Sequence, residues 1–218
     1  MDEKNEKVKV PKIREKSFIR EAMEWILCLL AAFVIAVVIK YFVFTPTLVQ
    51  QGSMTPTILN GERVLINRLV RTFKMPIYRG DIITFERPAA TNEDGTAYYD
   101  ENSGVASFVM HDLLEITKIS YIKRVIGVAG DHVKITNTGD VYVNDKLLNE
   151  TYLTEDLKTP ITGEFYDVVV PDGYVFVMGD NRNGSSDSRE FGFIPLEKVE
   201  GRVVHRIWPL NKLGKIDK

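Results

Sequence analysis

Residues 120–128 read SYIKRVIGV, and this run of nine residues decides the fold class. It is short and rich in β-branched and aromatic residues, and it lacks the 3.6-residue period of a helix, so it predicts a β-strand. Side chains alternate along a strand, and here each face carries one cation among apolar residues. One face holds Tyr121, Lys123 and Val125. The other face holds Ile122, Arg124 and Ile126.

Similar runs recur on both sides, about ten residues apart, with turn residues between them. Asn137-Thr138-Gly139-Asp140 predicts a hairpin, and Pro171-Asp172-Gly173 predicts a second turn. The other runs expected as strands are 63–67, 81–85, 132–136, 141–143, 168–170, 174–178 and 203–208, the last one stopped by Pro209. The pattern predicts a mainly β fold, built as an antiparallel sheet or barrel.

These strands belong to residues 45–218, a length that can bury one substantial core. Two stretches without clear periodicity interrupt them. Residues 86–117 are expected to form a long excursion between two strands, and residues 144–167 a second one.

A different kind of segment precedes the β-rich region. Residues 25–44 read WILCLLAAFVIAVVIKYFVF, and a helix of twenty residues spans about 30 Å, the thickness of a bilayer core. Lys40 lies near its end, where the ammonium can reach the interface. We expect a transmembrane signal anchor over residues 21–44 and a cytoplasmic tail over residues 1–20. A buried soluble helix is disfavoured because every face is apolar, and a cleaved signal peptide because no small-x-small site follows.

Charge counts set the expected orientation. Seven Lys and Arg residues precede the apolar run, whereas after Lys40, near the end of the run, the next one is Arg63. The N-terminus should therefore remain cytoplasmic and residues 45–218 extracytoplasmic. The whole chain of 218 residues has 28 basic and 30 acidic side chains, and this balance disfavours nucleic-acid binding. Cys28 is the only cysteine, which excludes an internal disulfide framework.

Three segments are candidates for chemistry. Ser53 follows Gly52 and precedes a proline-bearing turn, which leaves its hydroxyl accessible, although a Gly-Ser pair is typical of any loop. Lys123 in apolar surroundings would lose its proton easily and act as a general base, whereas a surface strand would leave both cations solvated. Residues 179–189 (GDNRNGSSDSR) are dense in hydrogen-bonding side chains, which suits either an ordered network or a polar surface loop.

Other catalytic classes have weaker support. The histidines His111, His132 and His205 stand in no recognisable triad signature, and the chain has no G-x-S-x-G motif. A histidine base remains open on spacing alone, because triads assemble in space. The scattered histidines and the lack of H-E-x-x-H disfavour a metal site.

Taken in order, the motifs resemble those of the type I signal peptidases. The matching segments are the anchor, Ser53-Met54-x-Pro56-Thr57, Arg79-Gly80-Asp81-Ile82, Tyr121 to Gly127 with Gly130-Asp131, and Gly179 to Arg189 with Phe191-Gly192. The resemblance covers nearly the whole chain, and the short length is similar to that of the Gram-positive enzymes.

The resemblance implies a membrane-bound serine endopeptidase that removes signal peptides from exported preproteins after Ala-x-Ala sites. It implies Ser53 as the nucleophile and Lys123 as its base. Supporting or oxyanion roles fall on Gln51, Asp180, Asn181, Ser185, Asp187 and Arg189, and substrate binding on Met54 and Tyr121. It also implies an antiparallel β catalytic domain with a small inserted region at 134–172, no cofactor, and export machinery nearby.

Two positions depart from the family pattern. Gln51 stands where Gly or Ser is common, so the second oxyanion donor differs, and Ala129 stands where Pro is common. Two other functions share some features. A self-cleaving Ser-Lys repressor is disfavoured by the membrane run, and a non-catalytic partner that binds signal peptides is disfavoured by the presence of both Ser53 and Lys123.

Overall fold

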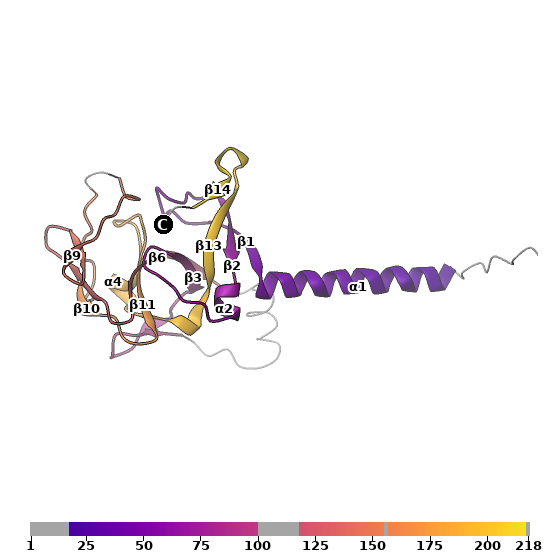
Figure 1. Ribbon diagram of the computed structural model, residues 1–218, viewed down its shortest axis with the longest axis horizontal. Coiled ribbons are helices and arrows are strands. Elements are labelled where there is room, and N and C mark those ends of the chain that lie inside the picture. The colour runs from indigo at the N-terminus through magenta and orange to yellow at the C-terminus, as the bar shows by residue number, and fades with distance from the viewer. Residues whose placement is uncertain (1–17, 100–117, 155–156, 217–218) are drawn as a thin grey trace, which may run out of the picture. The chain divides into compact units, whose positions relative to one another are not determined.

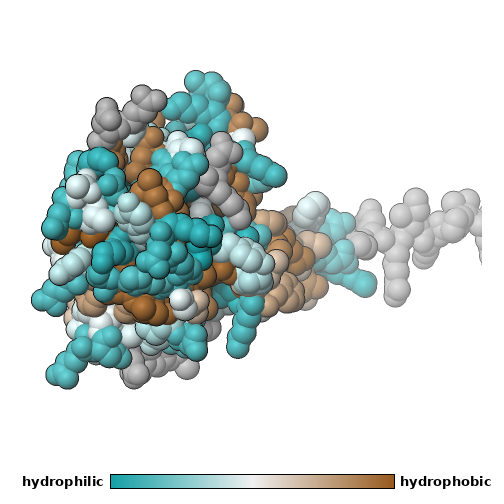
Figure 2. Space-filling model, turned by 60° about the vertical axis from the view of Figure 1, so that its left-hand side comes forward, coloured by the Kyte–Doolittle hydropathy of each residue, from teal (hydrophilic) through white to brown (hydrophobic). Residues whose placement is uncertain are grey.

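A computed structural model describes residues 18–99, 118–154 and 157–216. Its N-terminal element is the helix α1 (Phe18–Phe42), none of whose residues is buried. Among the described residues it is the one helix long and apolar enough to cross a membrane. The helix begins three residues before the segment 21–44 and ends two residues before its end, because the chain is already extended at Phe44. Figure 2 shows apolar side chains along this helix.

The rest of the described chain is built on antiparallel strands, as the sequence predicts (Figure 1). The larger sheet has the order β1-β2-β13-β3-β6-β11-β12, with β14 paired to β13. Its strands are β1 (Phe44–Leu48), β2 (Arg63–Asn67), β3 (Ile82–Glu86), β6 (Ser120–Val128), β11 (Tyr174–Met178), β12 (Ile194–Pro195), β13 (Val199–Trp208) and β14 (Gly214–Lys215).

A smaller antiparallel sheet has the order β10-β7-β8-β9. It consists of β7 (His132–Ile135), β8 (Val141–Val143), β9 (Lys146–Leu147) and β10 (Asp167–Val169). In Figure 1, β9 and β10 lie at the end of the domain away from β1 and β2. This sheet falls within and just before the stretch 134–172 that was expected as an inserted region.

Short elements complete the fold. They are α2 (Leu69–Thr72), α4 (Ser188–Phe191), the 3₁₀ turns η2 (Leu196–Lys198) and η3 (Leu210–Lys212), and a small hairpin of β4 (Ala90–Thr91) and β5 (Ala97–Tyr98). The hairpin occupies the start of the excursion expected at 86–117; residues 100–117 lie outside the described chain.

One sequence expectation is confirmed and one needs correction. The turn at 171–173 is present as predicted, and it joins β10 of the smaller sheet to β11 of the larger sheet. The last long strand is β13, which ends at Trp208 as predicted, but the chain returns after Pro209 and adds β14 along it.

Strand β6 lies between β3 and β11, and buried residues cover both of its faces. Val125 belongs to one apolar cluster, with Ile83 and Val177. On the opposite face, Ile122 packs against a second cluster that contains Met54. The central strand is therefore enclosed, and every polar side chain it carries toward a core must find a partner or lose its charge.

Candidate functional site

Ser53 lies in a turn that follows β1 and is half-buried. Asn181 ties this turn to the loop at 179–189: its backbone N–H donates to the Ser53 carbonyl over 3.0 Å, and its Nδ2 donates to the Gly52 carbonyl over 3.1 Å. The next side chain, Met54, is buried in the apolar cluster beside Ile122. The turn is thus held on both sides, and the Ser53 N–H donates no hydrogen bond within the described chain.

Lys123 is buried, with 2% of its surface exposed. Burial lowers the pKa of its ammonium to about 8, although the carboxylate of Asp187 opposes this shift. Its Nζ lies 5.1 Å from the ring centroid of Tyr121, which shares its face of β6. The alternative of a surface strand with two solvated cations is wrong, because Arg124 is buried as well.

Asp187 organises the loop at 179–189. Its carboxylate accepts hydrogen bonds from the Gly179 N–H over 3.0 Å and from the Ser185 hydroxyl over 2.7 Å, and it pairs with Arg189 at 2.8 Å. A side chain at Gly179 would overlap both the Ser53 carbonyl and the Ser185 hydroxyl. The absence of a side chain there lets the Ser53 turn and Ser185 approach the same point of the backbone.

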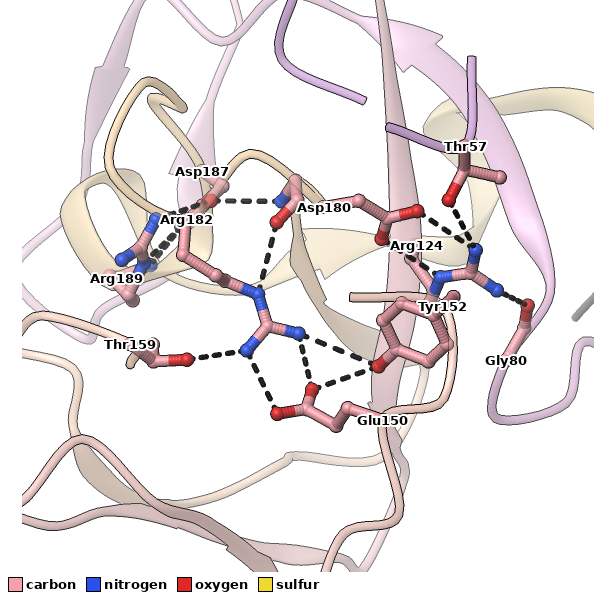
Figure 3. A network of polar contacts seen from close by, with 11 residues as sticks. Thr57, Gly80, Arg124, Glu150, Tyr152, Thr159, Asp180, Arg182, Asp187 and Arg189 are labelled. Carbon is pink, nitrogen blue, oxygen red and sulfur yellow. Dashed lines mark hydrogen bonds and ion pairs between the residues drawn. The ribbon is translucent and has the colours of Figure 1, made fainter. Parts of the chain in front are cut away.

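Arg124 lies on the face of β6 opposite Lys123 and forms a buried ion pair with Asp180. The pair is bidentate, with distances of 2.9 and 2.8 Å, and the guanidinium also donates to the Gly80 carbonyl over 3.1 Å. Its plane stacks on the ring of Tyr152 at 3.7 Å. Its Nη2 also lies 3.5 Å from Thr57 Oγ1, so Arg124 joins four segments of the chain, as Figure 3 shows.

Arg182 extends the same network into the excursion at 144–167 (Figure 3). Its guanidinium forms an ion pair with Glu150 and donates to Thr159 over 2.5 Å, while its Nε donates to the Gly179 carbonyl over 3.1 Å. Arg182 has no exposed side-chain surface, and Glu150 has 15%. The inserted excursion thus fixes the loop that holds the Ser53 turn.

A groove of about 310 Å³ lies beside Ser53. One wall comes from residues 47–51, in β1 and just after it, and the other from residues 118–122, at the start of β6. Strands β2, β3 and β13 lie between β1 and β6 in the sheet, and their residues line the groove as well. The groove also includes the predicted site residues Gln51, Met54 and Tyr121.

The structure gathers the predicted residues in one region of the domain. Ser53, Asn181, Ser185 and Asp187 are linked by the contacts above, and Asp187 and Asp180 act on the pKa of Lys123. Within the described chain no hydrogen bond joins Lys123 to a serine. Such bonds are often long in a ligand-free enzyme and shorten when substrate binds.

Other candidates lie elsewhere. His132 pairs with Asp167 on the exposed side of the smaller sheet, His205 lies where β14 joins β13, and His111 is outside the described residues. Sequence reasoning missed Arg182, Glu150 and Tyr152 as parts of the site. Arg182 had a signal, since it stands inside the polar loop, whereas nothing in the local sequence marks Glu150 as its partner.

Comparisons with known proteins relate the chain to one family. A family profile described as "Signal peptidase, peptidase S26" matches residues 22–208. Signal peptidase I of Bacillus licheniformis is 35% identical over an alignment of 201 positions, which covers 89% of this chain and 92% of the relative. Signal peptidase IB of Staphylococcus aureus (strain COL) is 34% identical over 88% of this chain and 93% of its own length. A crystal structure of a signal peptidase I from Enterococcus faecalis V583 aligns with a TM-score of 0.39 and 28% identity, over 58% of this chain and 96% of that one.

Proposed function

Because the chain belongs to the signal peptidase family, peptidase S26, whose members are serine peptidases that cleave signal peptides, we propose that it does so with a Ser53–Lys123 dyad. The observation that carries this proposal is the state of Lys123. Its amine is buried and its pKa is about 8, so a substantial fraction is neutral near physiological pH and can accept a proton.

In the proposed mechanism, neutral Lys123 removes the proton of the Ser53 hydroxyl as Oγ attacks the scissile carbonyl carbon. The resulting ammonium then gives this proton to the leaving amine, and an acyl-enzyme remains on Ser53. Lys123, neutral again, next removes a proton from water as the water attacks the ester carbonyl carbon. It then gives this proton to Ser53 Oγ as the acyl bond breaks, which restores the free enzyme. The hydroxyl of Ser185, which donates to Asp187 over 2.7 Å, orients the ammonium between these steps in this proposal.

The oxyanion needs hydrogen-bond donors near Ser53. The backbone N–H of Ser53 supports this role because it makes no other hydrogen bond within the described chain. The side chain of Gln51 is exposed and lines the same groove, so its amide is the candidate for the second donor. Asn181 keeps the turn in place through the Gly52 and Ser53 carbonyls.

The groove is the proposed site for the segment before the cleaved bond. An extended peptide lying between the walls at 47–51 and 118–122 would direct alternate side chains toward Met54 and Tyr121. Small side chains such as Ala suit this position, in keeping with Ala-x-Ala sites. We further propose that α1 spans the membrane with the N-terminus in the cytoplasm, so that the catalytic domain meets preproteins as the export machinery delivers them.

Cleavage of a preprotein tests the proposal directly. The full-length protein in lipid vesicles is incubated with a preprotein that has an Ala-x-Ala site, beside the variants Ser53→Ala and Ser186→Ala. Ser186 is an exposed serine of the same loop and serves as the control. The wild type and Ser186→Ala should release the signal peptide, and Ser53→Ala should not. Normal cleavage by Ser53→Ala would contradict the mechanism.

A further inference from the structure

A second cavity lies beside α2, and the proposed mechanism makes no use of it. Its volume is about 460 Å³, within the range of sites for small ligands. One side comes from residues between 70 and 77, in α2 and the turn after it, and the other from residues between 196 and 199, in η2 and at the start of β13. The apolar side chains of its lining are Val70, Met75, Pro76, Ile77, Leu196 and Val199.

The cavity adjoins the last turn of α1. Arg71, which lines the cavity, donates to the Tyr41 carbonyl over 2.9 Å, and its guanidinium lies 4.5 Å from the centroid of the Tyr41 ring. Thr72 donates to the Phe42 carbonyl over 2.9 Å. Tyr41 and Phe42 end α1, so α2 lies where the chain leaves the membrane span that we propose for this helix (Figure 1). This position at the membrane surface rests on the proposed function.

Large apolar side chains are exposed around the cavity. Phe73, directly after α2, is 70% exposed, and Met75 and Leu196 in the lining are 45% and 41% exposed. Single exposed apolar residues are common on soluble proteins, but a group of them beside a cavity marks a binding surface. Acyl chains are available to such a group at the end of a membrane span, and they cover it better than water does. The apolar part of the cavity therefore suits a lipid.

The charged side chains of the cavity favour an anionic lipid. Arg71 and Lys74 line it together with one carboxylate, that of Glu197. Within the described chain neither cation forms an ion pair, and the guanidinium of Arg71 donates only through Nη2, to the Tyr41 carbonyl. A guanidinium with unused N–H groups can bind a phosphate through two hydrogen bonds. Two cations against one carboxylate also favour a lipid of net negative charge over a zwitterionic one.

We propose that this cavity binds one anionic phospholipid of the extracytoplasmic leaflet. The phosphodiester lies between Arg71 and Lys74, and part of an acyl chain lies in the apolar cavity between Met75 and Leu196. The headgroup and the chain both contribute to the choice of lipid, because the cations and the apolar lining belong to one site. Since α2 follows β2 closely in the chain, the bound lipid gives the larger sheet an attachment to the bilayer besides α1.

Photo-crosslinking with a matched pair of lipids tests this inference. The full-length protein is reconstituted in phosphatidylcholine vesicles that contain a small fraction of a probe lipid with a diazirine in one acyl chain. The probe is phosphatidylglycerol in one sample and phosphatidylcholine in the other, and mass spectrometry locates the labelled residues. The phosphatidylglycerol probe should label residues 70–77 and 196–199 at least about fivefold more than the phosphatidylcholine probe, because two basic residues face the anionic headgroup.

The two cations provide the variants. Lys74→Gln and Arg71→Gln should each lower labelling of these residues by the phosphatidylglycerol probe about 3- to 5-fold, the loss expected for one basic residue at an anionic lipid surface. Lys146→Gln is the matched control, because it removes another exposed cation, in β9 of the smaller sheet, and changes the net charge by the same amount. This control should be labelled like the wild type.

Equal labelling by the two probes in the wild type would overturn the inference, and so would undiminished labelling in both variants. The wild-type ratio decides even if Arg71→Gln fails to fold. Failure of the proposed function gives different results. Cleavage that persists in Ser53→Ala would contradict the dyad and leave the lipid labelling unchanged, whereas no labelling of residues 18–42 by either probe would contradict the membrane placement of α1.

Discussion

Lys123 and Arg124 are neighbours in β6, yet their surroundings give them different roles. Arg124 has a bidentate carboxylate partner in Asp180, which balances the charge that burial isolates from water. Lys123 has no ion pair in the described chain and lies against the ring of Tyr121. The guanidinium therefore stays charged and joins segments of the fold, while the amine can change its protonation state.

Replacing Lys123 with methionine separates catalysis from stability. The side chains have similar lengths, so Lys123→Met should lower the cleavage rate by at least about 10³-fold, the loss typical of a removed catalytic base. The melting temperature of the variant should not fall. The amine of Lys123 is buried and has no ion-pair partner in the described chain, so its removal also removes the cost of taking a charge out of water. Cleavage and thermal unfolding of the full-length variant measure both. Substantial residual cleavage would exclude Lys123 as the base.

The pH dependence of cleavage should reflect the same amine. The pKa of Lys123 is lowered to about 8 by burial, and only the neutral amine accepts the serine proton. Hence kcat/KM should rise about tenfold per pH unit below pH 8 and level off above it, measured with a preprotein that has no group titrating in this range. A rate that is flat between pH 6 and 9 would contradict a lysine base with this pKa.

The sequence alone could predict the two faces of β6 but not their burial. Alternation assigned Lys123 to the face of Tyr121 and Arg124 to the face of Ile122. Whether either cation meets water depends on segments from distant parts of the sequence, such as the loop at 179–189, whose Asp180 pairs with Arg124. Local periodicity carries no information about such coverage, so the solvated alternative stayed open until the structure excluded it.

At the level of elements, the excursion at 144–167 acts on the loop at 179–189. Glu150 holds Arg182, Pro160 accepts a hydrogen bond from Arg189 over 3.1 Å, and Tyr152 stacks on Arg124. The strands were predictable from the sequence because runs of β-branched residues between turn residues mark them locally. The partners of Arg182 were not predictable, because ion pairs between distant loops leave no periodic pattern in the sequence.

Removing Glu150 tests this connection. Glu150→Ala leaves the guanidinium of Arg182 buried without the carboxylate that pairs with it. The free energy of unfolding should fall by about 2–4 kcal/mol. This loss is smaller than for a fully buried pair because Glu150 is partly exposed. For a domain of this size the melting temperature should fall by about 5–15 °C. Lys158→Ala, which removes the exposed partner of Asp140, is the matched control and should leave the midpoint unchanged. A stable Glu150→Ala variant would show that the ion pair does not hold the loop.

For the whole molecule, the groove and the helix α1 differ in how far the sequence predicts them. The helix follows an apolar run that only Lys40 interrupts, so its bounds were predictable to within three residues. The groove depends on curvature of the larger sheet, which brings β1 and the start of β6 to the same space although three strands separate them in sheet order. Curvature arises from twist and bulges along many strands, and no single run of residues encodes it.

The overall charge of −2 combines a basic N-terminal segment with a mildly acidic β-rich region, and this division predicts the orientation. Residues 1–24 carry seven Lys and Arg, and such residues stay on the cytoplasmic side of a membrane span. Cys28 is the only cysteine, so the variant Cys28→Ser has no thiol. A cysteine introduced into this variant is then the one thiol that a membrane-impermeant maleimide can label in intact cells. Glu197→Cys, at an exposed position of η2, should be labelled, and Lys4→Cys only after the cells are permeabilised. Labelling of Lys4→Cys in intact cells would reverse the orientation and place the proposed dyad in the cytoplasm.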